Sequence, residues 1–437
     1  MDKLKKLFAK QSFRKIAGNS WWLLFDKIFR LFIVAIVSIW IARYLGPEDF
    51  GVLNYSLAFI GFFGPFIALG LNHIITRDIV NEGNYIDILG TSFLLRFISG
   101  LVCTCLAYLL IYIIRPNAGH LHIFILILGF GQTLRSFSIL DYWFQSRLES
   151  KYVAISRSVA LIFVSTLKVG AILIELDLIY FVILFSLEYA LSEMILAAAY
   201  KYKGESIFEW KFKIRLAVSY LKDVSPLILA GFATVIYMKI DKFMLGEMIS
   251  DEAVGIYSAA AQLSEAWYAI PVALAASFFP KLLDYKKHNK TKYYASLEGL
   301  MRLMVIIALL ISVPIALISQ QIIDLLYGPS YHGAGVVLAV HIWASIFIFA
   351  RAVLSKWILA ENLLKFAFIS QLFGAITNII LNLILIPVYQ ELGSAIATVI
   401  SYSFASYLFL FFFKETKRMA YIMTSAIFLP HKVFKDV

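Results

Sequence analysis

The sequence predicts an all-α integral membrane protein with about twelve transmembrane helices. They would form two six-helix lobes related by a pseudo-two-fold axis along the membrane normal. Composition, the recurrence of long apolar segments and an internal repeat support this prediction. Of the 437 residues, 61% are hydrophobic and only 15% are charged, with a mean hydropathy of +0.82. A soluble domain is about half apolar and about a quarter charged, so this composition excludes a soluble globular protein.

Apolar segments long enough to cross a bilayer follow one another along the whole chain. A helix needs about 20 mostly apolar residues to span the hydrocarbon core. We expect spans at 20–43, 52–74, 88–113, 121–143, 152–174, 178–200, 224–246, 253–280, 297–319, 333–356, 366–387 and 392–413. The predicted domains are then a basic segment 1–19, an N-terminal lobe 20–200, a basic linker 201–223, a C-terminal lobe 224–413 and a tail 414–437.

The loops between the predicted spans alternate in charge. Lys and Arg gather in 1–19, 201–223 and 281–296, whereas the intervening loops carry mainly Asp and Glu beside Arg43 and Arg115. The positive-inside rule therefore predicts that both termini are cytoplasmic, in a bacterial or archaeal cytoplasmic membrane. Most of the net charge of +11 is a topology signal, and we expect no nucleic acid as a partner.

The linker 201–223 combines basic residues with apolar and aromatic ones. This combination is typical of a helix that lies in the membrane interface. We expect such a helix here, with Ile207, Phe208, Trp210 and Phe212 as its apolar contacts.

A short motif occurs twice, about 200 residues apart. The first copy, 45–52, reads Leu-Gly-Pro-Glu-Asp-Phe-Gly-Val; the second begins Leu245-Gly246-Glu247 and continues with Asp-Glu-Ala-Val-Gly-Ile at 251–256. Each copy follows an odd-numbered span and places an acid three residues before a glycine, where the positive end of a new helix would favour it. Two halves of six spans have the same orientation, as in several transporter folds whose substrate sites lie between the halves.

Residues 42–51, Ala-Arg-Tyr-Leu-Gly-Pro-Glu-Asp-Phe-Gly, carry a resemblance to a known family, together with Leu69-Gly70-Leu71 and Arg77-Asp78. This segment resembles the opening of the polysaccharide flippases of the O-antigen and exopolysaccharide type. Their superfamily also contains multidrug and toxin extruders and the peptidoglycan-precursor flippase. The second copy at 245–257 fits the same pattern, and the twelve spans match over nearly the whole chain. The resemblance does not specify which glycan is moved.

Ionisable residues inside the predicted spans fall into two groups by depth. Those within about five residues of an inner end can reach the headgroups with their long side chains; they are Arg157, Arg302, Arg351 and Asp141. An unpaired cation farther in would cost at least about 2.5 kcal/mol against lipid. We expect the deeper cations to line a cavity and bind substrate phosphates, which suit guanidinium and ammonium groups; they are Arg30, Arg96, Arg135, Lys168 and Lys239. The alternative is structural pairing that locks helices together.

Four acids within the spans are candidates for ion coupling or for charge pairing. Asp26 lies four residues before Arg30 on one helix face, so the two can pair. Asp241 stands between Lys239 and Lys242, whereas Glu188 and Glu265 have no local partner. The sequence does not distinguish H⁺ from Na⁺ as the coupling ion.

These features lead to the hypothesis of a flippase for an undecaprenyl-pyrophosphate-linked oligosaccharide. It would move the glycan from the cytoplasmic to the outer leaflet by alternating access, driven by an ion gradient. Expected partners are the polyprenyl-pyrophosphate-linked glycan, membrane lipids and other proteins of glycan assembly.

Two alternatives remain open. A cation-coupled multidrug extruder would share the architecture, but it would favour acids in its cavity. A membrane polymerase or glycosyltransferase of the same pathway would carry a large outer loop with catalytic groups. The sequence has no nucleotide-binding Gly-x-x-x-x-Gly-Lys loop and no His/Cys cluster with metal-ligand spacing. We therefore expect a transporter with no catalytic residue, no metal site and no cofactor.

Overall fold

The computed structural model describes the backbone of residues 2–82 and 84–428, and their side chains outside 2–21, 23–28, 73, 82 and 225–227. Every regular element in this part of the chain is a helix. Nine of the described helices are long and apolar enough to cross a membrane, and the number rises to ten if the bent helix α8 is one span. The predicted class, an all-α multi-pass membrane protein, is confirmed.

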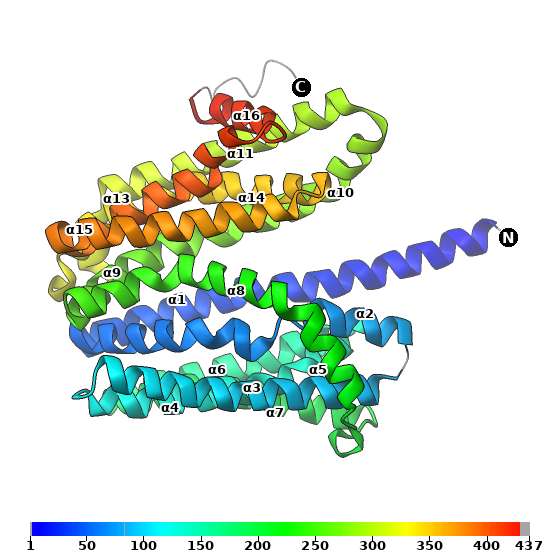
Figure 1. Ribbon diagram of the computed structural model, residues 1–437, viewed down its shortest axis with the longest axis horizontal. Coiled ribbons are helices and arrows are strands. Elements are labelled where there is room, and N and C mark those ends of the chain that lie inside the picture. The colour runs from blue at the N-terminus through cyan, green and yellow to red at the C-terminus, as the bar shows by residue number, and fades with distance from the viewer. Residues whose placement is uncertain (1, 83, 429–437) are drawn as a thin grey trace. The chain divides into compact units, whose positions relative to one another are not determined.

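The chain divides into two compact units (Figure 1). The first contains the described residues of 1–41 and 56–235, and the second contains those of 42–55 and 236–437. Helices α1 (Asp2–Ala68) and α8 (Ile214–Met248) contribute to both. The predicted lobe boundaries, with a linker at 201–223, stay a prediction.

The first unit otherwise comprises α2 (Asn72–Glu82), α3 (Tyr85–Ile114), α4 (Gly119–Leu134), η1 (Arg135–Ser138), α5 (Ile139–Ser146), α6 (Lys151–Leu173), α7 (Leu178–Tyr202) and η2 (Ile207–Glu209). The second comprises α9 (Asp251–Glu265), η3 (Ala266–Tyr268), α10 (Ala269–His288), α11 (Lys290–Leu317), α12 (Ser319–Leu326), η4 (Pro329–Tyr331), α13 (Ala334–His341), α14 (Ala344–Glu361), α15 (Leu364–Ser406), η5 (Leu408–Phe412) and α16 (Lys417–Phe428).

Breaks in helical geometry account for the difference between these helices and the predicted spans. Helix α1 breaks at Gly46, where φ is 75°, and α15 breaks at Gln390, where φ is 51°. Positive φ is readily accessible to glycine, which explains the Leu-Gly-Pro sequence of the first repeat copy. Helix α8 is bent by 51° between its parts Ile214–Val224 and Ile228–Met248. Dividing α1 and α15 at their breaks makes the described helices consistent with twelve spans.

Close contact between α3 and α4 shapes the first unit. A Cβ added at Gly100 would lie 2.8 Å from the Thr133 hydroxyl oxygen, and one added at Gly129 would lie 2.6 Å from a Thr104 methyl carbon. Each glycine thus accommodates a threonine of the other helix, as is common where membrane helices pack closely. This contact packs α3, which carries Arg96, against α4, whose last residue directly precedes Arg135.

The two copies of the repeat pack against each other within the second unit. A Cβ at Gly51 would lie 1.7 Å from the carbonyl oxygen of Asp251, and one at Gly255 would lie 1.9 Å from the carbonyl oxygen of Pro47. Each glycine therefore accommodates backbone from the other copy. The hydroxyl of Tyr55 donates a hydrogen bond of 2.7 Å to Glu247 beside this contact.

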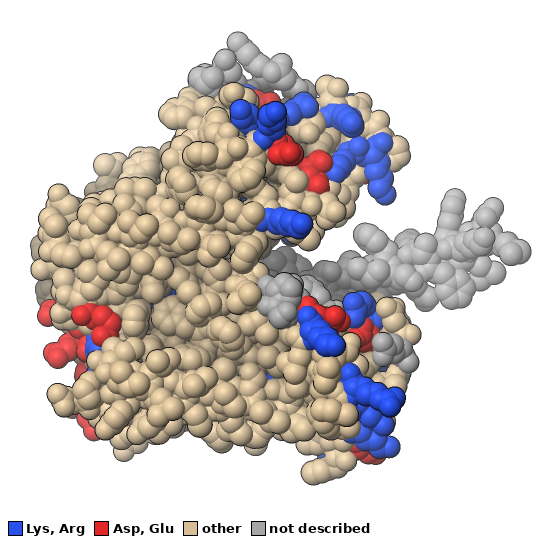
Figure 2. Space-filling view, in the orientation of Figure 1, with Lys and Arg blue, Asp and Glu red and all other residues tan. Residues whose placement is uncertain are grey.

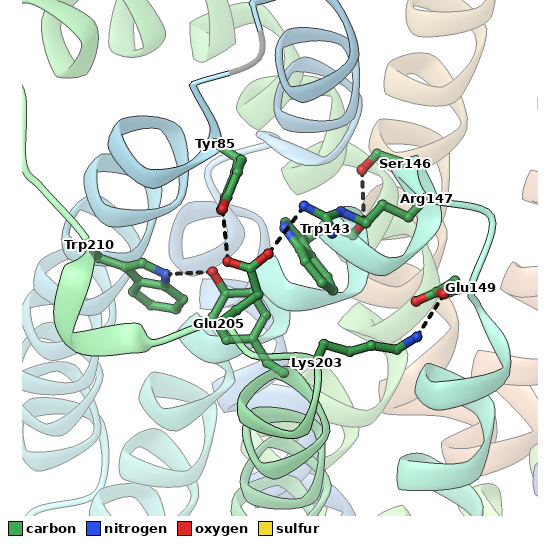
Figure 3. A network of polar contacts seen from close by, with 9 residues as sticks. Tyr85, Trp143, Ser146, Arg147, Glu149, Lys203, Glu205 and Trp210 are labelled. Atoms are coloured by element: carbon green, nitrogen blue, oxygen red, sulfur yellow. Dashed lines mark hydrogen bonds and ion pairs between the residues drawn. The ribbon is translucent and has the colours of Figure 1, made fainter.

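Polar contacts connect the linker after α7 to neighbouring segments of the first unit (Figure 3). Glu205 accepts hydrogen bonds from the Tyr85 hydroxyl at 2.8 Å and from Nη2 of Arg147 at 3.3 Å. The Lys203 ammonium donates to Glu149 at 2.8 Å, and this hydrogen bond raises the pKa of the Lys203 amino group. After the end of α7, the segment 201–223 is helical in the single turn η2 and again from Ile214, where α8 begins, and its remaining residues follow an irregular path.

We expect Gly51→Ala and Gly255→Ala to destabilise the second unit. The added methyl group would meet backbone rather than a flexible side chain, so helices must separate at a cost of about 1–3 kcal/mol. Thermal unfolding of the purified variants in detergent measures this loss. The control is Gly299→Ala in α11, where a Cβ would have no neighbour within 4 Å. Equal melting temperatures for all three variants would contradict the packing described here.

We expect Glu205→Ala to loosen the linker, because the change removes the acceptor for both Tyr85 and Arg147. Limited trypsin digestion should then cleave after Lys211 or Lys213 about tenfold faster, since each charged hydrogen bond contributes about 1.5–3 kcal/mol. Glu209→Ala is the matched control, because its side chain is exposed in the same linker. If both variants are cleaved at the wild-type rate, the Glu205 contacts do not hold the linker.

Candidate functional site

Glu188 forms ion pairs with two basic side chains of the first unit. Its Oε1 lies 3.3 Å from Nη1 of Arg30, and its Oε2 lies 3.1 Å from Nζ of Lys168. The Lys168 side chain is only 4% exposed, and its ammonium also lies 3.7 Å from the centroid of the Phe185 ring. These contacts join α1, α6 and α7 through one carboxylate. Arg30 thus pairs with Glu188; the side chain of Asp26, its predicted partner, lies outside the described residues.

A second group of charges surrounds Arg96, which is buried on α3. Neither its Nε nor its Nη1 has a hydrogen-bond partner in the described part of the chain. Its electrostatic neighbours lie on η1, α5 and α7, and they are Arg135, Asp141, Tyr142 and Glu193. Asp141 forms an ion pair with Arg157 of α6, so it is already shared. The carboxylates of Asp141 and Glu193 thus lie near three arginines, of which Arg96 and Arg135 form no ion pair with a described acid.

Arg135 differs from Arg96 in its surroundings. Its side chain is exposed, and its Nη1 donates a 3.2 Å hydrogen bond to Gln132. The guanidinium carbon lies 4.9 Å from the centroid of the Tyr189 ring, on α7. No described acid forms an ion pair with it, although Glu193 acts on it at longer range. The structure thus places Arg135 near the Arg96 group but outside its buried part.

A buried carboxylate surrounded by neutral donors lies in the second unit. Asp241 of α8 accepts hydrogen bonds from Asn382 Nδ2 at 2.6 Å, from the Thr398 hydroxyl at 3.0 Å and from the Tyr257 hydroxyl at 3.1 Å. Ser394 in turn donates to Oδ1 of Asn382 at 3.0 Å. Elements α8, α9 and α15 therefore converge on one carboxylate.

Lys242, the residue after Asp241, forms its hydrogen bond with another residue. Nζ of Lys242 donates to Oδ1 of Asn54 at 3.2 Å. Glu265, at the end of α9, interacts electrostatically with Lys239, Asp241 and Lys242. The structure thus brings Lys239, Asp241 and Glu265 into one group, in which two cations balance two acids.

The sequence did not indicate that amide side chains would surround Asp241. Asn378 and Asn382 are four residues apart in an otherwise apolar span, and the Asn382 amide also donates to Oδ1 of Asn378 at 3.1 Å. Two amides on one face of a membrane helix were a usable signal, because buried polar groups in lipid need partners. Among the described residues, no three His, Cys, Asp or Glu side chains form a group that could hold a metal ion.

Two family profiles each match more than half of the chain. The profile described as "Polysaccharide biosynthesis protein" matches residues 16–286, and the profile described as "Lipid II flippase MurJ" matches residues 194–433. Both describe transport or glycan assembly in membranes, and they indicate a transporter rather than an enzyme.

Two relatives agree with these matches. "Probable flippase AglR" of Haloferax volcanii is 33% identical over 178 residues, which is 39% of this chain and 37% of that protein. The chain thus aligns with little more than a third of AglR. "Capsular polysaccharide biosynthesis protein CapF" of Staphylococcus aureus is 23% identical over 396 residues, which is 86% of this chain and 93% of that protein.

Solved structures share the fold. The structure described as "Lipid II flippase MurJ, inward closed conformation" has a TM-score of 0.69 at 16% identity, covering 95% of this chain and 92% of that one. An inward-facing multidrug resistance MATE family transporter has a TM-score of 0.67 at 15% identity, covering 92% and 96%. The fold, the family profiles and the motif at 42–51 therefore agree, and the chain belongs to the polysaccharide biosynthesis protein family.

Proposed function

We propose that the protein is a flippase that moves an undecaprenyl-pyrophosphate-linked oligosaccharide from the cytoplasmic to the outer leaflet. The observation that carries this proposal is Arg96, a buried cation with two nitrogen atoms that lack a partner among the described residues. A buried charge is costly unless it is paired and hydrogen-bonded. Phosphate oxygens suit the open side of a guanidinium, because they accept two parallel hydrogen bonds.

The charge balance of the first unit supports an anionic substrate. Two neighbouring arginines of this unit, Arg96 and Arg135, form no ion pair with a described acid. A multidrug extruder of the same fold would bind cationic compounds, and a positive interior opposes them by direct repulsion. The shared fold of the MATE transporter therefore does not favour drug export for this chain.

The distribution of surface charge supports the proposed orientation. In Figure 2, Lys and Arg of the first unit gather near α5 and the beginning of α8, and those of the second unit gather near α16 and the turn between α10 and α11. The positive-inside rule makes these ends cytoplasmic. The substrate would therefore enter from the leaflet in which lipid-linked glycans meet cytoplasmic glycosyltransferases.

Asp241 is the proposed ion-coupling group, with H⁺ or Na⁺ as the ion. Its hydrogen-bond donors among the described residues are all neutral, so no positive charge contacts the carboxylate directly. A proton would neutralise it directly. Rotation of the Asn378 and Asn382 amides would turn their oxygens toward a cation, and carboxylate, carbonyl and hydroxyl oxygens suit hard cations. One charge that crosses 100 mV supplies about 2.3 kcal/mol to the cycle.

We expect the purified protein in proteoliposomes to move an undecaprenyl-pyrophosphate-linked oligosaccharide between leaflets. A membrane-impermeant glycosidase or lectin measures the fraction that reaches the outer face. Arg96→Gln should slow this transfer at least about tenfold, because one charged hydrogen bond to phosphate contributes about 1.5–3 kcal/mol. Arg215→Gln, which removes an exposed cation at the beginning of α8, is the control. A wild-type protein that moves no such lipid would refute the proposal, and wild-type transfer by Arg96→Gln would refute the role of Arg96.

We expect transfer by the wild-type protein to depend on an imposed Na⁺ or proton gradient, and Asp241→Asn to abolish that dependence. Asparagine keeps the shape of the side chain and one acceptor oxygen, and its NH2 group can donate to the hydroxyls of Thr398 and Tyr257, but it removes the charge that a cation would neutralise. The same proteoliposomes, prepared with each gradient separately, give the measurement. Asp284→Asn is the control, because this exposed aspartate lies outside the buried site. Gradient-dependent transfer by Asp241→Asn would exclude Asp241 as the coupling group.

A further inference from the structure

An apolar groove of about 460 Å³ runs between α4 and α7 on the surface of the first unit. Its walls include Leu126, Phe130 and Leu134 from α4 and Ile183, Leu187 and Ala190 from α7. The two helices lie side by side in Figure 1, and both belong to candidate membrane spans. The groove therefore offers an apolar chain a fitted surface at membrane depth.

Arg135 adjoins two residues that line this groove. It directly follows Leu134, and its guanidinium lies over the ring of Tyr189, which directly precedes Ala190. Both partners given by the structure, Gln132 and Tyr189, are neutral. The aromatic face and the amide thus hold the guanidinium next to the part of the wall formed by Leu134 and Ala190, while its side chain stays exposed.

The depth of Arg135 restricts what can bind it. The residue belongs to the candidate span Gly119–Ser146, and Ser146 lies roughly 16 Å farther along at about 1.5 Å per residue. A cation exposed at this depth needs an anion or water. The phosphate of a resident phospholipid stays at the interface, whereas a lipid that is being translocated must bring its phosphate past this level.

We propose that the α4/α7 groove and Arg135 form a binding site for a polyisoprenyl phosphate, with the isoprenoid tail in the groove and the phosphate on Arg135. This inference rests on the proposed function, since it assigns a place for the carrier lipid of the proposed substrate. Apolar walls match the tail, and an exposed guanidinium without an ion pair to a described acid matches the phosphate.

Native mass spectrometry of the detergent-purified protein, with undecaprenyl phosphate as the probe, tests the site. We expect Arg135→Gln to weaken binding at least about tenfold and Arg135→Lys to retain most of it, because lysine keeps the charge. Ala190→Trp should also weaken binding, because the indole would fill the groove. Arg215→Gln and Ile113→Trp are the controls, which change an exposed cation and an exposed apolar residue away from the groove. Melting temperatures measured in parallel identify variants that fail to fold.

Three outcomes decide between the possibilities. Unchanged binding of undecaprenyl phosphate by folded Arg135→Gln and Ala190→Trp would overturn the proposed site. Equal binding of phosphatidylglycerol, with the same loss in these variants, would also overturn it, since the groove would then hold an ordinary anionic phospholipid. If the expected pattern appears but the wild-type protein moves no lipid-linked oligosaccharide in proteoliposomes, the lipid site stands and the proposed function fails.

Discussion

Glu188 and Asp241 are both carboxylates inside helical bundles, yet the protein compensates them in opposite ways. Glu188 lies against the two cations Arg30 and Lys168, whereas Asp241 lies among the neutral donors of Asn382, Thr398 and Tyr257. Loss of a proton or an ion from a carboxylate in a low-dielectric interior is costly unless a partner remains. Glu188 keeps such partners at all times, so it serves to hold three helices together. Among the described residues, the hydrogen-bond donors to Asp241 are all neutral, which is why we propose it as the ion-coupling group.

The helical framework was largely predictable from the sequence because it follows from hydropathy and from a few special backbone positions. The span pattern and the all-α class follow from the hydropathy, and the Leu-Gly-Pro motif corresponds to the break at Gly46. The paired glycines of the repeat have a packing reason as well, because Gly51 and Gly255 face backbone of the other copy. The linker is helical only in η2 and from Ile214 onward, whereas the irregular part around Glu205 depends on distant contacts from Tyr85 and Arg147, which hydropathy does not indicate.

The partners of the buried charges were not predictable in the same way. Helical spacing tells which residues share a face, and it suggested Asp26 as a partner for Arg30; the side chain of Asp26 lies outside the described residues. Two contacts that spacing could not suggest are those of Arg30 with Glu188, 158 residues away, and of Asp241 with Asn382, 141 residues away. Such contacts depend on the rotation and depth of whole helices, which local sequence does not encode.

The amides of Asn378 and Asn382 were not predicted for a different reason. The sequence was searched for charged residues, and neutral side chains were not considered, although buried carboxylates in lipid need them as hydrogen-bond donors.

The buried and exposed cations of the first unit differ in how many acidic side chains neutralise their charge. A flippase would need such a difference. Lys168 shares a carboxylate, Arg96 has open donors beside the acids Glu193 and Asp141, and Arg135 has only neutral contacts. A site that carries a substrate must bind well enough to admit it and weakly enough to release it. Three uncompensated arginines would hold a pyrophosphate too tightly, because charge attraction is strong at low dielectric. In the proposed cycle, a phosphate that first meets Arg135 would pass to Arg96, and the nearby acids Glu193 and Asp141 would weaken its attraction to that buried guanidinium.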